Sequence, residues 1–167
     1  MFLKLIKDYF IKKEVKINPE SYKPNCDTVG VVIDKGQLPN YKELITLLQN
    51  DVFKDFSLFF LIFDEKKADG DKINSDYISS KSYTLTGDFK DPLIDDFVKK
   101  DYFLLLGVYQ NNPYLNKIIN CKFAKYKIGF NQVNNHIFNV SLNGSMIQDA
   151  EFIEPLKLNL KSFNIIK

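Results

Sequence analysis

The chain has 167 residues, a length typical of one domain with room for a hydrophobic core. Hydrophobic residues make up 45% of it and charged residues 26%, which excludes an intrinsically disordered protein. All 23 basic residues are lysine and the net charge is only +2, so the chain lacks the guanidinium groups that read phosphates and guanine edges, and we expect no nucleic-acid partner.

The sequence also predicts where the protein resides. Its longest unbroken apolar run, Leu58 to Phe63, is too short to span a bilayer. Charges interrupt the apolar residues of the opening MFLKLIKDYFIKKEVK, and no small-residue cleavage site follows, so it does not read as a signal peptide. We expect a cytoplasmic protein, at most peripheral to the inner membrane, with Cys26 and Cys121 reduced.

The first predicted element is an amphipathic helix over residues 2–14. At 3.6 residues per turn one face carries Phe2, Leu3, Leu5, Ile6, Tyr9 and Phe10. The opposite face carries Lys4, Lys7 and Asp8. Two interpretations are open: the helix lies on the core, or it contacts a protein partner or an anionic membrane surface. We therefore divide the chain into an N-terminal helix, residues 1–17, and a single domain, residues 18–167.

The next elements form a β-α-β unit. TVGVVID, residues 28–34, is a β-branched run typical of a strand buried on both faces. A helix with apolar residues at helical spacing follows over residues 41–52, and SLFFLIF, residues 57–63, is a second buried strand. Two strands joined by a helix in this way are expected to be parallel.

The remaining elements continue the alternation of strands and helices. Residues 64–81 are polar and read as a long loop. Strands are predicted at 83–86, 101–108, 126–130 and 136–142, and helices at 92–99, 113–121 and 149–163, with Pro155 in or near the first turn of the last helix. This order predicts an α/β fold: a three-layer Rossmann-like domain with a mostly parallel central sheet, plus the N-terminal amphipathic helix.

A candidate ligand site lies at the junction GVYQNNPY, residues 107–114. At the carboxyl end of a parallel strand and the start of a helix, Tyr109, Asn111 and Asn112 would be placed to donate to a phosphate or a sugar. The alternative is local: Asn112 caps the helix and Pro113 occupies its first position. The sequence leaves both interpretations open.

The first strand ends in a comparable loop, Asp34, Lys35, Gly36 and Gln37. It is neither a G-x-G-x-x-G fingerprint nor a P-loop, so it does not by itself indicate a nucleotide. Asp34, Lys35 and Gly36 are retained as candidate ligand-binding residues because they follow a buried strand. A solvated strand end is the alternative.

Other site chemistries have little to build on. The acidic stretch from Asp64 to Asp76 lacks the closing glutamate of a calcium loop, and no Cys/His cluster has zinc-ligand spacing. His136 is the only histidine, there is no G-x-S-x-G elbow, and Cys121 falls on an apolar helix face. Asp91, Asp95 and Asp96 suit the beginning of a helix. We expect no metal, no cofactor and no catalytic residue.

The segment DYFLLLGVYQNNPYLNKIINCKFAKYKIGFN has a shape that can be compared with known families. Through DYFLLLGVYQNN and KYKIGF it resembles an uncharacterised family of short bacterial α/β proteins, which has no established activity. More distantly it is similar to the N-terminal Rossmann-like half of heptosyltransferase-type glycosyltransferases, with Lys127 in the basic position before Ile128, Gly129 and Phe130. The first strand departs from that pattern, because Asp34-Lys35-Gly36 replaces the expected glycine-and-aspartate loop, and the second, nucleotide-binding half has no counterpart here.

These observations favour a binding or protein-interaction module without catalytic activity of its own, with the N-terminal helix as a candidate contact surface. The alternative, which the resemblance implies, is a small glycosyltransferase-like protein that binds an anionic ligand, a sugar or a nucleotide at the carboxyl ends of the strands.

Overall fold

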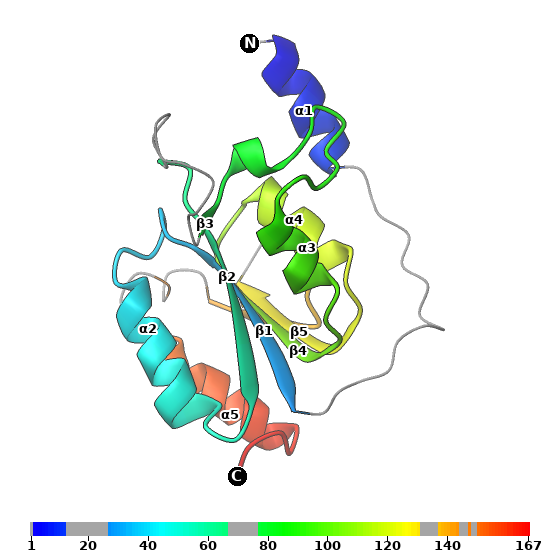
Figure 1. Ribbon diagram of the computed structural model, residues 1–167. Helices are drawn as coiled ribbons and strands as arrows, with labels where there is room; N and C mark the ends of the chain where they lie inside the picture. Colours follow the sequence, from blue (N-terminus) through cyan, green and yellow to red (C-terminus); the bar gives the residue numbers. More distant parts are fainter. Residues whose placement is uncertain (1, 13–26, 67–76, 131–136, 144–146, 148–149) are drawn as a thin grey trace.

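The computed structural model describes residues 2–12, 27–66, 77–130, 137–143, 147 and 150–167. A six-stranded, all-parallel sheet forms the centre of the molecule (Figure 1), in the order β3-β2-β1-β4-β5-β6. The strands are β1 Thr28–Asp34, β2 Ser57–Phe63, β3 Tyr77–Ile78, β4 Tyr102–Val108, β5 Ala124–Phe130 and β6 Val140–Leu142. This is the strand order of a Rossmann-like domain, so the predicted fold class is confirmed.

Helices cover both faces of the sheet. They are α1 Phe2–Lys12, α2 Tyr41–Leu47, α3 Pro92–Val98, α4 Pro113–Asn120 and α5 Ile153–Ser162. A π-helical turn, Leu48–Val52, extends α2, and a short 3-10 helix occupies Ser80–Ser82. In Figure 1, α2 and α5 lie on one side of the sheet, and α3 and α4 lie on the other.

Two hydrophobic layers result from the alternation of side chains along the strands. Val29, Val31 and Ile33 of β1 point into the layer beneath α2 and α5, whereas Val32 belongs to the layer beneath α3 and α4. Neighbouring strand residues face opposite sides of a sheet, so a run buried at every position, as β1 is, needs cover on both faces.

The prediction of a strand over residues 83–86 is wrong. The third strand is Tyr77–Ile78, inside the stretch that reads as loop, and Tyr83 makes only an isolated antiparallel bridge to Phe89. The polypeptide turns back at Gly87, whose φ of 82° is left-handed, and Thr84 N–H donates to Asp88 C=O. The sequence does not indicate this strand, because only two of its residues pair with β2 and polar residues precede and follow them.

α1 forms where predicted, but its orientation differs from the predicted apolar face. Leu5 and Tyr9 are 60% and 70% exposed, whereas Ile11 is 2% exposed and belongs to the core beneath α3 and α4. Lys7, predicted on the outer face, turns inward, and its ammonium donates to the carbonyls of Ser80 and Tyr83. Within the described residues, no helix has the length and apolar character to cross a bilayer.

Candidate functional site

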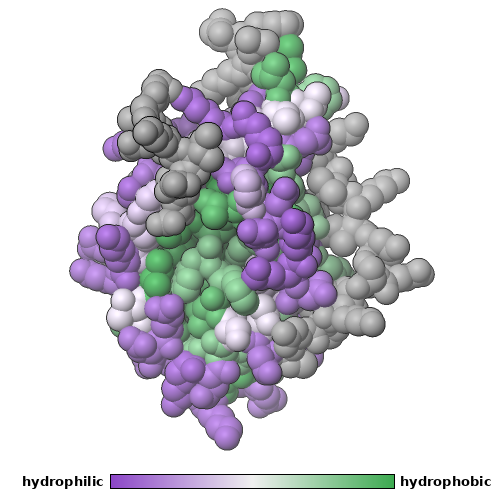
Figure 2. All heavy atoms as spheres, viewed as in Figure 1, coloured by the Kyte–Doolittle hydropathy of each residue, from purple (hydrophilic) through white to green (hydrophobic). Residues whose placement is uncertain are grey.

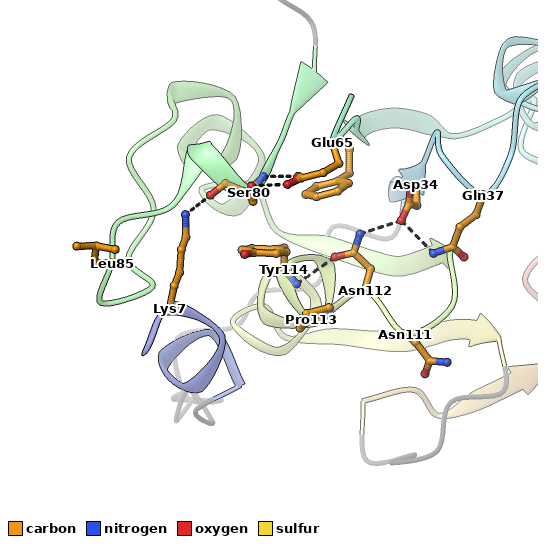
Figure 3. A pocket seen from close by; sticks show the side chains of 11 residues that line it. Lys7, Asp34, Gln37, Glu65, Ser80, Leu85, Asn111, Asn112, Pro113 and Tyr114 are labelled. Carbon is orange, nitrogen blue, oxygen red and sulfur yellow. Dashed lines mark hydrogen bonds between the residues drawn. The ribbon is translucent and has the colours of Figure 1, made fainter. Parts of the chain in front are cut away.

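The carboxyl ends of β1 and β4 form the topological switch point of the sheet. In the sheet, β2 lies on one side of β1 and β4 lies on the other. The loops that follow β1 and β4 therefore lead to opposite sides of the sheet, and a crevice forms between them. A cavity of about 590 Å³ lies there (Figure 3). It is lined by Lys7, Asp34, Gln37, Phe63, Glu65, Ser80, Leu85, Asn111, Asn112, Pro113 and Tyr114.

Asp34, the last residue of β1, is the centre of a hydrogen-bond network in this cavity. Asp34 is 8% exposed as a residue, and its carboxylate accepts three hydrogen bonds from uncharged donors. Gly36 N–H donates to Oδ1 at 2.9 Å, and the side-chain amides of Gln37 and Asn112 donate to Oδ2 at 3.0 and 2.8 Å. A buried carboxylate is stable when its oxygens are bonded in this way.

Gln37 links the loops that follow β1 and β4. Its side-chain nitrogen donates to the carbonyl of Gln110 at 2.7 Å, and its side-chain oxygen accepts from Gln110 N–H at 2.6 Å. The same nitrogen also bonds Asp34. One amide side chain therefore pairs with the backbone as a neighbouring strand would, and it fixes the distance between the two loops.

Asn112 caps α4, which is one of the two roles that the sequence left open, and it also bonds the Asp34 carboxylate. Its Oδ1 accepts from Tyr114 N–H and Leu115 N–H, which confirms the predicted cap of α4, and Pro113 occupies the first helical position. Its Nδ2 donates to Asp34. Since Pro113 has no N–H and Asn116 N–H bonds the carbonyl of Asn112, the first four positions of α4 offer no unbonded N–H to an anion.

The opposite wall of the cavity comes from β2, the 3-10 helix and α1. Glu65 accepts from the backbone N–H of Ser80 at 3.0 Å and from its hydroxyl at 2.6 Å. The Lys7 ammonium bonds the carbonyl of Ser80 and lies 5.7 Å from the centre of the Tyr114 ring. The Tyr114 ring in turn stacks on Phe63, with the ring centres 5.8 Å apart. An aromatic wall thus adjoins a polar rim (Figure 3).

Of the predicted site residues, Asp34, Asn111 and Asn112 line the cavity. Asn111 is exposed and left-handed, with φ 50°, a conformation that asparagine tolerates better than most residues.

Three predicted residues do not line the cavity. The Lys35 ammonium lies 2.6 Å from the Asp64 carboxylate and over the Tyr77 ring, and its hydrogen bond to Asp64 raises its pKa. Gly36 contributes only its N–H to Asp34. Tyr109 is completely buried in the core, against Phe138.

Several cavity residues were missed from the sequence: Lys7, Gln37, Glu65, Ser80 and Tyr114. A signal existed for Glu65, which closely follows the second parallel strand, because the carboxyl ends of parallel strands meet at one edge of a sheet. For Lys7 and Ser80 no local pattern indicated the contact, since residues 73 positions apart form it.

Cys121 and Lys127, which also bear on possible chemistry, do not line the cavity. Burial raises the pKa of the Cys121 thiol to about 11, so it is not a thiolate at neutral pH, and His136 is outside the described residues. Lys127 donates to the carbonyl of Ile119 near the end of α4, and burial lowers its pKa to about 8. Within the described part of the chain, no three His, Cys, Asp or Glu side chains cluster as metal ligands would.

Comparisons with known proteins identify the family. Neither the curated proteins nor the solved structures include a match, so they show no link to glycosyltransferases. A family model does match, and it covers residues 4–163, which is nearly the whole chain. This chain, with its all-parallel sheet and its cavity at the switch point, belongs to the family of unknown function DUF6913.

Proposed function

We propose that this domain is a non-catalytic binding module that holds a small, uncharged, polyhydroxylated ligand, a sugar or a related polyol, in the cavity between β1 and β4. The observation that carries the proposal is the buried Asp34 carboxylate at the switch point, fixed by Gly36, Gln37 and Asn112. Its Oδ1 accepts a single one of the hydrogen bonds described above and retains capacity for a ligand hydroxyl.

The charges of the cavity favour an uncharged ligand over an anion. By formal charge the lining holds Asp34, Glu65 and one lysine, which leaves one net negative charge. Lys7 is bonded to two carbonyls, Lys35 is paired with Asp64, and the start of α4 is capped by Asn112. A phosphate would meet a carboxylate without a dedicated cation, so a nucleotide, the ligand of a glycosyltransferase-like protein, is the weaker candidate.

The shape of the lining suits a sugar. The partly exposed ring of Tyr114, with the buried Phe63 stacked behind it, offers an apolar surface for the C–H groups of a pyranose. Asn111 and the Glu65–Ser80 pair present side-chain donors and acceptors at the rim. Pockets with a mostly apolar lining and a few fixed polar groups are typical small-molecule sites.

A thermal-shift screen with neutral sugars, polyols, sugar phosphates, nucleotides and nucleotide-sugars tests this proposal. A neutral sugar or polyol at about a hundred times its dissociation constant should add roughly 2.7 kcal/mol, a rise in Tm on the order of 5 to 10 °C for a domain of this size. Asn111→Gly removes a lining amide and permits the left-handed backbone, so it should keep the stability of the fold and reduce the shift.

Asn164→Gly is the matched control, because Asn164 is also exposed and left-handed, with φ 56°, and it does not line the cavity. Its shift should equal that of the wild type. A shift given only by phosphates or nucleotides would contradict the uncharged ligand and favour glycosyltransferase-like descent. No shift with any compound would contradict ligand binding in this cavity.

A second candidate function, interaction with a protein partner through α1, is favoured by the exposure of Leu5 and Tyr9. They lie one helical turn apart and so form one apolar strip. The inward orientation of Lys7 removes one cation from the helix surface, which makes an anionic membrane the less favoured contact.

Leu5→Ser/Tyr9→Ser should leave Tm within about 2 °C of the wild type, because exposed side chains contribute little to folding. The double variant should lose any partner that the wild type retains in a pull-down. Ile11→Ser, on the same helix, should instead destabilise the protein, since Ile11 is a core residue. Retention of the partner by the double variant would refute this role, and binding of the wild type to anionic liposomes in flotation would indicate a membrane instead.

A further inference from the structure

The outer edge of β2 is open over most of its length. β3 pairs only with Ile62 and Phe63, and among the described strands none pairs with the outer side of residues 57–61. Figure 2, in the same view as Figure 1, shows apolar surface in the centre, where β2 runs. An unpaired strand edge is a template for another strand.

The pattern of backbone bonds shows which groups face outward. Ser57 N–H donates to Asp27 C=O and Phe63 C=O accepts from Lys35 N–H, so the odd-numbered residues of β2 bond toward β1. Asp64 N–H donates to Ile78 C=O on the β3 side. Because bonding sides alternate along a strand, the N–H and C=O groups of Leu58 and Phe60 point outward from the sheet.

Within residues 57–61 themselves, none of the usual devices that prevent a strand edge from pairing is present. Residues 57–61, SLFFL, contain no proline, lysine or other charge, and their register with β1 is continuous, without a bulge. Leu58, Phe59 and Phe60 are all partly exposed. Strand edges in soluble proteins are normally blocked by such devices or covered.

We propose that β2 is a self-association surface, on which a second copy of this chain pairs antiparallel about a two-fold axis at Phe59. Leu58 of each copy then faces Phe60 of the other, and their outward N–H and C=O groups form four hydrogen bonds between the copies. The two six-stranded sheets become one continuous sheet.

The geometry favours a second copy over an unrelated strand. The open segment has Phe59 at its centre, and its outward groups, at Leu58 and Phe60, are symmetric about that residue, so the edge is complementary to itself. So short an interface predicts a dimer that dissociates on dilution.

Disulfide trapping tests both the pairing and its register. In a background with both native cysteines changed to serine, Phe59→Cys places two thiols at the axis in a non-hydrogen-bonded pair, where Cα atoms lie about 4.5 Å apart, within disulfide range. Ser57→Cys is the control, because its two copies would be offset by four residues, about 13 Å along the strand. We expect oxidation to crosslink the first variant and not the second.

The native chain supplies a second readout. Sedimentation should show a monomer–dimer equilibrium, and the amides of Leu58 and Phe60 should gain protection from hydrogen exchange as the protein concentration rises. A wild type that stays monomeric at its highest soluble concentration would overturn the proposal, whether or not Phe59→Cys folds. Equal crosslinking of both cysteine variants would overturn the register. Protection only in the presence of another protein would assign the edge to a different partner.

Discussion

Asp34→Asn is expected to lower the free energy of unfolding by about 2 to 3 kcal/mol, although the two side chains have the same shape. All three described partners of the carboxylate are donors: Gly36 N–H and the side-chain amides of Gln37 and Asn112. In the variant, the N–H₂ group of the asparagine must face at least one of these three N–H donors, so two buried donors then meet without an acceptor between them. Urea denaturation followed by circular dichroism measures the loss.

Asp96→Asn is the matched control, because Asp96 is exposed on α3 and the same change there should cost less than about 0.5 kcal/mol. If both variants lost equally little, the Asp34 network would not hold the two loops together. The proposed site would then lose its structural basis, since Gln37 and Asn112 are oriented by the same carboxylate.

Gly30→Ala is expected to destabilise the protein by about 1 to 3 kcal/mol, through overpacking at the centre of the sheet. A Cβ at Gly30 would lie 2.6 Å from Leu105 Cδ2 and 2.9 Å from both Phe97 Cζ and Tyr102 Cε1. All three side chains are buried, so the core has no solvent side toward which they can move. Thermal and urea unfolding would both register the change.

Two further variants test whether overpacking at Gly30 is the cause of the loss. Gly36→Ala adds the same methyl group where it would meet only Asp34 Oδ1, at 3.2 Å, so its cost should be smaller. Gly30→Ala combined with Leu105→Val should recover part of the lost stability, because the closest contact is removed. A double variant no more stable than the sum of the two single effects would contradict the packing explanation.

The sequence by itself determined the elements whose signals are local. The β-branched or aromatic runs of β1 and β2 predicted both strands at the residues where they occur, 28–34 and 57–63. A short apolar run bounded by polar residues is typical of a buried strand. Asn112-Pro113 predicted a capped helix for the same reason: a cap involves only residues within one turn. The parallel class followed from the alternation of these elements.

Orientation of side chains was decided by the tertiary structure. Periodicity placed Leu5 and Tyr9 of α1 on one apolar face and left open whether that face packs on the core. In the structure both are exposed, and the bonds of Lys7 to two carbonyls 73 and 76 residues away accompany this rotation of the helix. Tyr109 follows a strand that is buried on both faces, and such a strand gives no alternation by which to tell a core ring from a ligand-facing one.

The assembly of the candidate site was likewise beyond the sequence. Asp34 and Asn112 are 78 residues apart, and they meet only because β1 and β4 are neighbours in the sheet. Strand order is set by how the helices pack on both faces, a non-local property that residue patterns do not encode. The same order leaves β2 with a two-residue neighbour and an open edge. Local chemistry thus determined which elements form, and long-range packing decided which residues face one another.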